Sequence, residues 1–254
     1  MSAPRQRLDH ALVERGLMPT RARAQSAIRS GDVLVAGEVV SKPARMVGDD
    51  DLIELSSSVQ RYVSRAALKL VHALDHFNID VRDKFCLDLG ASTGGFVEVL
   101  LERHAAHVIA IDVGHGQLVP ALAGNPRVTS YEGLNAKDIE PKHLGTKLDI
   151  VTCDVSFISL EKATRHLLDL MLETLDLVQE NAHLIFLVKP QFEVGKANLG
   201  KGGIVRDAAL HARTCDNLSS WLRNRGEWEV FDIIESPILG GDGNKEFLMV
   251  AVKK

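Results

Sequence analysis

Residues 85–96, FCLDLGASTGGF, constrain the fold of this chain more than any other stretch of its sequence. A short apolar run ends at Asp88-Leu89-Gly90, a loop of small residues follows, and Gly94-Gly95 opens a second apolar stretch. This order predicts a strand, a tight turn and the start of a helix. Glycines let a backbone approach a ligand closely, and the free N–H groups of a helix start favour polar or anionic ligand groups.

A second apolar run, HVIAID, ends at Asp112, about 20 residues beyond the loop, where an acid can bind both hydroxyls of an adenosine ribose. The loop is neither a strict GxGxxG nor followed by GK[ST], so NAD and ATP are weaker interpretations. S-adenosylmethionine fits better, because its sulfonium needs a close, carbonyl-rich backbone and no pyrophosphate cradle.

Strand-like apolar runs recur through the rest of the chain, and helical stretches separate most of them. This alternation predicts an α/β fold with a mostly parallel sheet and helices on both faces. The last two runs follow each other without a helix, so we expect a terminal hairpin that places one antiparallel strand in the sheet. The seven runs are FCLDLG, HVIAID, RVTSYE, LDIVTCD, HLIFLVK, WEVFDII and EFLMVAV.

The N-terminal part has a different organisation, and we expect a small α+β domain with its linker at 1–60 ahead of a larger domain at 61–254. Two short helical stretches precede a hairpin signal at Ala36-Gly37. Residues 1–31 hold six arginines against two acids, although the whole chain has a net charge of -4. Local charge steers a polyanion more than the total does, so this part is a candidate RNA-binding module.

The hydrophobic fraction of 45% and the charged fraction of 25% are those of an ordinary globular protein. No apolar run approaches the roughly 20 residues that span a membrane, and MSAPRQRLDH lacks the apolar core of a signal peptide. We therefore expect a cytoplasmic protein with no membrane partner. Cys86, Cys153 and Cys215 are widely spaced and fit buried thiols better than a disulfide or a metal site, so no metal is expected.

Four charged residues lie at or near the strand ends where ligands of open α/β sheets bind. Lys189 and Asp154 each close a strand-like run, Glu246 begins the last one, and Lys69 lies in the helix before the first. Taken singly, each has an ordinary alternative: a lysine extending to solvent, a helix N-cap acid, a surface acid and a solvated helix lysine.

Together, two lysines and two acids beside a methyl donor suit deprotonation of a ribose 2′-hydroxyl. Lysine has a reference pKa of about 10.4, which must fall toward neutrality for the amine to act as a base. Desolvation and a second positive charge lower it, and acids orient the amines. We predict that Lys189 is the base, that Asp154 and Glu246 orient the lysines, and that Lys69 assists.

The chain resembles the TlyA family, haemolysin-named bacterial proteins that are ribosomal RNA 2′-O-methyltransferases. The resemblance covers nearly the whole sequence and rests on RLDHALVERGL, VSRAALKL, CLDLGASTGGF, DVGHGQL, DVSFISL, LVKPQFEVGK, GKGGIVRD and SPILGGDGNKEF. It implies an S4-type RNA-binding domain followed by a Rossmann-like, FtsJ-like domain that uses S-adenosylmethionine. The family's Lys-Asp-Lys-Glu tetrad falls on Lys69, Asp154, Lys189 and Glu246.

The resemblance also implies site residues. Phe157 either lines the methyl-transfer pocket or is a core residue, and residues 195–207 either close on RNA or form a plain surface loop. This chain departs from the family pattern at His115, where a tyrosine is usual, and at Gly133-Leu134, where an Arg-Thr pair is usual. The cofactor residues are Asp88, Gly90, Ala91, Ser92, Gly94, Gly95, Asp112, Val113, Asn135 and Asp154. The RNA-binding residues are Arg5, Arg7, Arg21, Arg23, Arg29, Lys42, Lys196, Lys201 and Arg206.

The activity implied is methylation of a cytidine ribose in ribosomal RNA. The large subunit is favoured, because family members that act on both subunits carry extensions at both ends. Three alternatives stay open: an RNA-binding ribosome-assembly factor with an inactive methyltransferase domain, a membrane-active haemolysin, and a methyltransferase of a base or small molecule. No strongly amphipathic cationic helix supports the second, and the third needs no paired lysines. The target nucleotide and the oligomeric state, monomer or weak dimer, stay undetermined.

Overall fold

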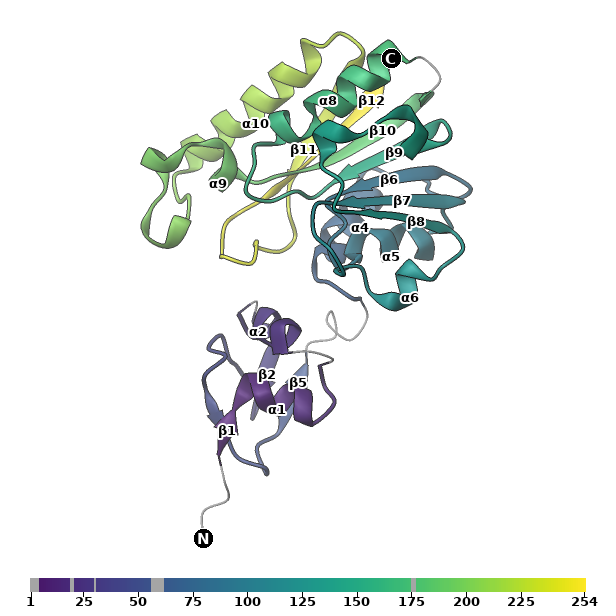
Figure 1. The fold of residues 1–254 in the computed structure, drawn as a ribbon. Helices are drawn as coiled ribbons and strands as arrows, with labels where there is room; N and C mark the ends of the chain where they lie inside the picture. Colours follow the sequence, from purple (N-terminus) through teal and green to yellow (C-terminus); the bar gives the residue numbers. More distant parts are fainter. Residues whose placement is uncertain (1–4, 19–20, 30, 56–61, 175–176) are drawn as a thin grey trace. The chain divides into compact units, whose positions relative to one another are not determined.

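The computed structural model describes residues 5–18, 21–29, 31–55, 62–174 and 177–254 (Figure 1). The chain divides into two compact units. The smaller is built on residues 1–62 with 240–243, and the larger on residues 63–239 with 244–254. Among the described residues, no helix combines the length and apolar character needed to cross a bilayer.

Within its described residues, the smaller unit packs helices α1 and α2 against short antiparallel strands around a core that includes Leu8, Leu12 and Ile28. Its three-stranded sheet has the order β3-β2-β5, and β1 pairs with β4 in a second ladder that the sequence did not predict. The predicted hairpin at Ala36-Gly37 is confirmed, and both residues have positive φ, as a two-residue turn of this kind requires. The elements are β1 (Gln6–Arg7), α1 (Leu8–Glu14), α2 (Arg21–Arg29), β2 (Val33–Val35), β3 (Glu38–Val39), β4 (Met46–Val47) and β5 (Ile53–Leu55).

The larger unit is built on a seven-stranded sheet with the order β11-β12-β10-β9-β6-β7-β8. In the described part of this sheet, β12 runs opposite to the other six strands, so the predicted terminal hairpin and mostly parallel sheet are confirmed. The strands are β6 (Phe85–Leu89), β7 (His107–Asp112), β8 (Val128–Glu132), β9 (Leu148–Cys153), β10 (Val178–Val188), β11 (Trp228–Glu235) and β12 (Phe247–Lys253).

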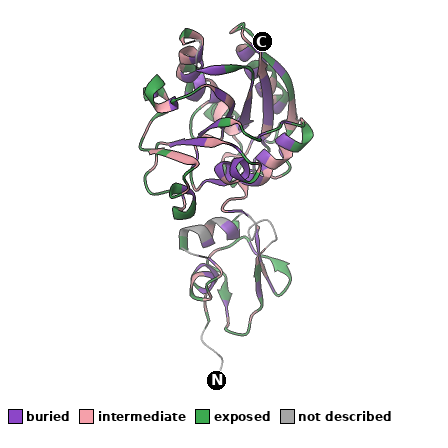
Figure 2. Ribbon diagram, turned by 90° about the vertical axis from the view of Figure 1, so that its right-hand side faces the viewer, coloured by how far each residue is buried: buried purple, intermediate pink, exposed green. Residues whose placement is uncertain are grey.

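Helices cover both faces of this sheet, with α8 and α10 on one side and α4 and α5 on the other (Figure 1). The central strands are consequently buried (Figure 2), and Leu87, Val151 and Phe186 are inaccessible to solvent. The helices are α4 (Ala66–His76), α5 (Gly95–Glu102), α6 (Pro120–Ala123), α7 (Pro141–Leu144), α8 (Leu160–Glu173), α9 (Pro190–Glu193) and α10 (Ala208–Arg223). Three 3₁₀ turns are η1 (Ala136–Asp138), η2 (Lys196–Asn198) and η3 (Lys201–Gly203).

The topology brings distant parts of the sequence to one edge of the sheet. Leu89 of β6 pairs with Cys153 of β9, so Gly90 and Asp154 follow neighbouring strand ends. Val188 of β10 pairs with Phe247 of the antiparallel β12, so Lys189 ends one strand where Glu246 precedes the other. This edge is where ligands of such sheets bind.

Candidate active site

A cavity of about 150 Å³ opens at this edge of the sheet. Most of the predicted cofactor residues reach it, together with one of the two predicted lysines. Gly94, Asp112, Val113, Asn135, Lys69 and Glu246 are not part of its wall. The lining residues are Ser64, Ala66, Asp88, Gly90, Ala91, Ser92, Thr93, Gly95, Phe96, Asp154, Ser156 and Lys189.

Asp88 gives the cavity a buried acceptor. The residue is 1% exposed, and its Oδ1 accepts a hydrogen bond of 2.7 Å from Thr152 Oγ1. Its Oδ2 has no hydrogen-bond partner among the described residues. Burial raises the pKa of Asp88 to about 7, against the Thr152 hydrogen bond and with support from the charges of Asp154 and Asp112. A cationic donor in the cavity would satisfy this carboxylate, which fits the ammonium of S-adenosylmethionine.

The glycines of the loop are required mainly by protein packing. Gly90 has φ +85°, and a Cβ there would lie 2.8 Å from the Asp154 carbonyl oxygen. Gly94 has φ +101°, and a Cβ on Gly95 would lie 2.8 Å from Ser64 Cβ. The sequence suggested that these glycines admit a ligand; the structure shows that they also let β6, β9 and α4 approach one another closely.

Asp112 ends β7 and anchors two loops through its carboxylate. Its Oδ2 accepts from Ser92 N and its Oδ1 from Gly114 N, both at 2.7 Å. Each carboxylate oxygen keeps a second lone pair, so the predicted contact to ribose hydroxyls remains chemically possible. Val113 is 63% exposed beside it, and Asn135 is exposed and accepts from Lys137 N at 3.1 Å as the cap of η1.

Lys189 forms the first of two ion pairs at this edge. Its Nζ lies 2.6 Å from Asp154 Oδ1 and donates to Ser156 Oγ at 2.8 Å. The approach to Asp154 is that of an ion pair rather than an aligned hydrogen bond, since Oδ1 lacks a partner of good hydrogen-bond geometry. Lys189 is 8% exposed, so it does not extend to solvent. Asp154 is not the N-cap of α8, a place that Ser159 takes.

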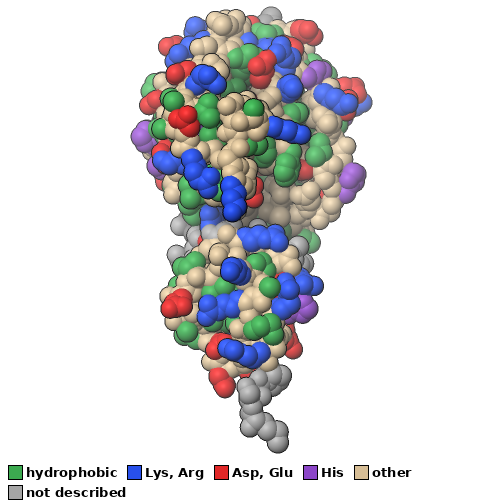
Figure 3. Space-filling view, turned by 90° about the vertical axis from the view of Figure 1, so that its left-hand side faces the viewer, with side chains coloured by type: hydrophobic (Ala, Val, Ile, Leu, Met, Phe, Trp, Pro, Cys, Tyr) green, Lys and Arg blue, Asp and Glu red, His purple; other side chains and the backbone are tan. Residues whose placement is uncertain are grey.

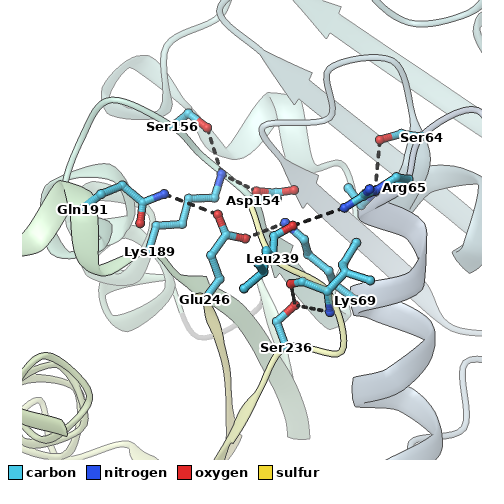
Figure 4. A network of polar contacts seen from close by, with 12 residues as sticks. Ser64, Arg65, Lys69, Asp154, Ser156, Lys189, Gln191, Ser236, Leu239 and Glu246 are labelled. Atoms are coloured by element: carbon cyan, nitrogen blue, oxygen red, sulfur yellow. Dashed lines mark hydrogen bonds and ion pairs between the residues drawn. The ribbon is translucent and has the colours of Figure 1, made fainter. Parts of the chain in front are cut away.

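Lys69 and Glu246 form the second pair, with Nζ and Oε2 2.5 Å apart. Both residues are buried, at 6% and 3% exposure. Lys69 is therefore not a solvated helix lysine, and Glu246 is not a surface acid. Gln191 Nε2 lies 3.4 Å from the other oxygen of Glu246. Figure 4 shows the four side chains converging from α4, the ends of β9 and β10, and the start of β12. Ser156 and Gln191 were missed by the sequence analysis, because polar residues beside a motif carry no signal of their own.

Phe157 is not a core residue. It is 90% exposed and has φ +68°, a left-handed conformation that is strained for an aromatic residue. Its ring lies 5.4 Å from that of Phe192, centroid to centroid, two residues after Pro190. Glu193 Oε1 accepts from Leu160 N at 2.7 Å and so ties the two aromatic segments together.

Basic side chains dominate the face of the smaller unit seen in Figure 3. Arg7 and Arg21 both bind the buried carboxylate of Asp9, with closest approaches of 2.9 and 3.0 Å, and are 41% and 52% exposed. The predicted RNA-binding arginines at these two places are therefore held by an acid rather than fully solvated. Arg5, Arg29 and Lys42 are exposed, and the side chain of Arg23 lies outside the described residues. In the larger unit, Lys196, Lys201 and Arg206 are exposed on the segment after α9.

The two departures from the family pattern lie against each other. A Cβ on Gly133 would come within 2.4 Å of His115 Nε2. The imidazole thus takes space that a side chain at residue 133 would need, so the two positions are coupled.

Comparisons with known proteins agree with this arrangement. A family model described as FtsJ-like methyltransferase matches residues 62–253, and an S4 domain model matches residues 6–53. The 16S/23S rRNA (cytidine-2'-O)-methyltransferase TlyA of Mycobacterium tuberculosis is 42% identical over 97% of this chain and 90% of its own length. Hemolysin A of Brachyspira hyodysenteriae is 40% identical over 95% of this chain and 98% of its own. The structure of a proposed hemolysin from Streptococcus thermophilus has a TM-score of 0.75 at 36% identity, and the match covers 100% of this chain and 90% of that one.

Proposed function

The chain belongs to the TlyA family, with an S4 domain ahead of an FtsJ-like methyltransferase domain, and we propose that it methylates the ribose 2′-oxygen of a cytidine in ribosomal RNA. One observation carries the choice of a hydroxyl as acceptor: two buried lysine–carboxylate pairs meet at the binding edge of the sheet. Such pairs suit a very weakly acidic acceptor, which needs a positioned base.

The cavity residues fit S-adenosylmethionine as the methyl donor. Asp88 offers its unpartnered oxygen to an ammonium group, and Asp112 offers lone pairs to ribose hydroxyls. When bound, S-adenosylmethionine supplies a methyl group made electrophilic by its sulfonium. Asp154 and Lys189 line the same cavity, so the donor site and the proposed base share one wall.

In its neutral form, after losing its own proton, Lys189 takes the proton of the 2′-hydroxyl at Nζ while that oxygen accepts the methyl group, and Asp154 and Ser156 hold the amine at the cavity wall. Asp154 and Ser156 orient the amine, which limits the geometries in which it meets the hydroxyl. Lys69, fixed by Glu246, contributes a second ammonium that stabilises negative charge developing on the ribose oxygen.

Phe157 stacks on the base of the target nucleotide. Lys69 and Lys189 are almost wholly buried, so a nucleotide that leaves its stack brings its 2′-hydroxyl closer to them, and an exposed aromatic ring compensates for lost stacking. The smaller unit holds the surrounding RNA through phosphate contacts from Arg5, Arg7, Arg21, Arg29 and Lys42, which give affinity without sequence choice. The large ribosomal subunit is the favoured substrate, and the cytoplasm is the place of action.

The test uses pure protein, donor labelled with tritium in its methyl group, and separate ribosomal subunits from a strain that lacks this protein. We expect label in large-subunit RNA, and nuclease digestion followed by mass spectrometry should find it as 2′-O-methylcytidine. Label on a base would overturn the assignment of a ribose acceptor. No incorporation into either subunit by folded, donor-binding protein would overturn the proposed activity.

A further inference from the structure

Two sequence motifs, GKGGIVRD and SPILGGDGNKEF, meet at a buried amide whose role the proposed reaction does not explain. Asn244 is 1% exposed, and its Oδ1 accepts from Val205 N at 2.9 Å. Its Nδ2 donates to Gly203 O at 3.2 Å. The amide thus binds a donor and an acceptor of the same short turn, which fixes both the place and the orientation of that turn.

The turn that Asn244 holds presents two cations. Gly200 N donates to Ile204 O at 3.1 Å and closes the turn around η3, which contains Lys201. Arg206 directly follows the anchored Val205. Both basic side chains are exposed, and neither has an ion pair within the part of the chain that the structure describes. An exposed, anchored pair of cations suits the phosphates of a nucleic acid.

The segment that contains Asn244 also carries Glu246, two residues further on. A second contact repeats the connection, because His211 on α10 approaches Val205 O at 3.0 Å and its ring packs 5.7 Å from that of Phe247. The turn is therefore bound on both sides of Glu246, at Asn244 and through Phe247. A shift of the turn would act on the carboxylate that holds Lys69.

We propose that Asn244 is a positioning residue that couples phosphate contacts made by Lys201 and Arg206 to the placement of Glu246. RNA bound at the turn then favours the arrangement of Glu246 and Lys69 that methyl transfer requires. The inference rests on the proposed function, and it adds to it a reason why substrate binding and catalytic geometry are linked.

The test is a double-mutant cycle measured with the full chain on ribosomal subunits. We expect the paired change Lys201→Ala with Arg206→Ala to raise KM for RNA and to lower kcat about fivefold. Asn244→Ala should lower kcat by a similar factor. Adding the paired change to Asn244→Ala should then leave kcat within about twofold of the single variant, because the link is already broken. Asn198→Ala is the matched control, since Asn198 is exposed and its side chain donates to Val194 O within its own segment; it should leave kcat unchanged.

The inference would be overturned if the combined variant lost kcat by the product of the two separate factors. It would also be overturned if Asn244→Ala changed KM alone. Should Asn244→Ala fail to fold, Asn244→Ser serves in its place, because a hydroxyl is too short to span both backbone partners. Folding is checked through affinity for S-adenosylmethionine, which the coupling does not require to change. A wild-type protein that does not methylate RNA would overturn the proposed function together with this inference, whereas an active wild type with independent factors overturns this inference alone.

Discussion

Replacing Glu246 by glutamine separates stability from chemistry at the buried pair. The change keeps the size of the side chain and removes the charge that faces Lys69 Nζ at 2.5 Å. Both partners are almost wholly buried, so water cannot replace the lost carboxylate. An uncompensated ammonium in such a place costs about 3–5 kcal/mol of stability.

The double variant Lys69→Met with Glu246→Leu provides the comparison. Replacing both members of a buried ion pair by apolar residues of similar volume is often neutral or stabilising, so we expect most of the lost stability to return. Methyl transfer should nevertheless be lost in the double variant, because the ammonium of Lys69 is gone. A pair with a purely structural role would instead regain activity along with stability.

Tryptophan fluorescence during urea unfolding measures the stability of the larger unit, which contains Lys69 and Glu246. The two tryptophans of the chain, Trp221 and Trp228, both lie in the larger unit, so their signal follows its unfolding alone. The reasoning is refuted if Glu246→Gln unfolds at the wild-type urea concentration, or if the double variant methylates RNA at more than about a tenth of the wild-type rate.

Three further predictions concern single residues. Because burial raises the pKa of Asp88 from its ordinary value near 4 to about 7, the folded state binds the extra proton in this range, and stability should fall as pH rises through it. Asp88→Asn should flatten the dependence of the urea midpoint on pH between 4 and 7, and an unchanged slope would contradict the assignment. Phe157→Ala should lower kcat/KM for RNA by about 5- to 150-fold with donor affinity unchanged, the range of one lost base stack; unaltered RNA kinetics would exclude stacking. Asp9→Ala removes the negative charge that pairs with Arg7 and Arg21, so filter-binding assays should show a steeper salt dependence of RNA binding, whereas an identical salt slope would argue that the two arginines do not contact phosphate.

Local patterns in the sequence were sufficient to predict the framework of the larger unit. Each of the seven predicted runs became a strand, and the signal was clearest for the central strands, because buried parallel strands need continuous apolar sequence. The pairing of Gln6–Arg7 with Met46–Val47 escaped prediction, since two-residue strands have no periodicity to detect. The start of helix α4 at Ala66 was not predictable to the residue, and Ser64 Oγ accepts from Ala66 N at 3.2 Å.

Sequence motifs and strand-end positions predicted part of the candidate site. Lys69, Asp154, Lys189 and Glu246 came from the family resemblance and strand-end positions, and their roles stay predictions. Pairing partners were not predictable, because ion pairs such as Arg21 with Asp9 depend on how two helices pack. The contacts of Ser156, Gln191 and Asn244 were not predictable either, since each joins segments that lie far apart in the sequence and meet only in the fold.

The most direct test of the proposed reaction is a comparison of wild-type protein with Lys189→Ala in two measurements. Calorimetry should find an affinity for S-adenosylmethionine within about threefold of wild type, because Lys189 is proposed to act on the RNA hydroxyl. Transfer of labelled methyl to ribosomal RNA should fall by about 10²–10⁴-fold, the usual contribution of a general base. A variant that binds the donor and still methylates RNA within tenfold of the wild-type rate would contradict the role given to the two lysine–carboxylate pairs.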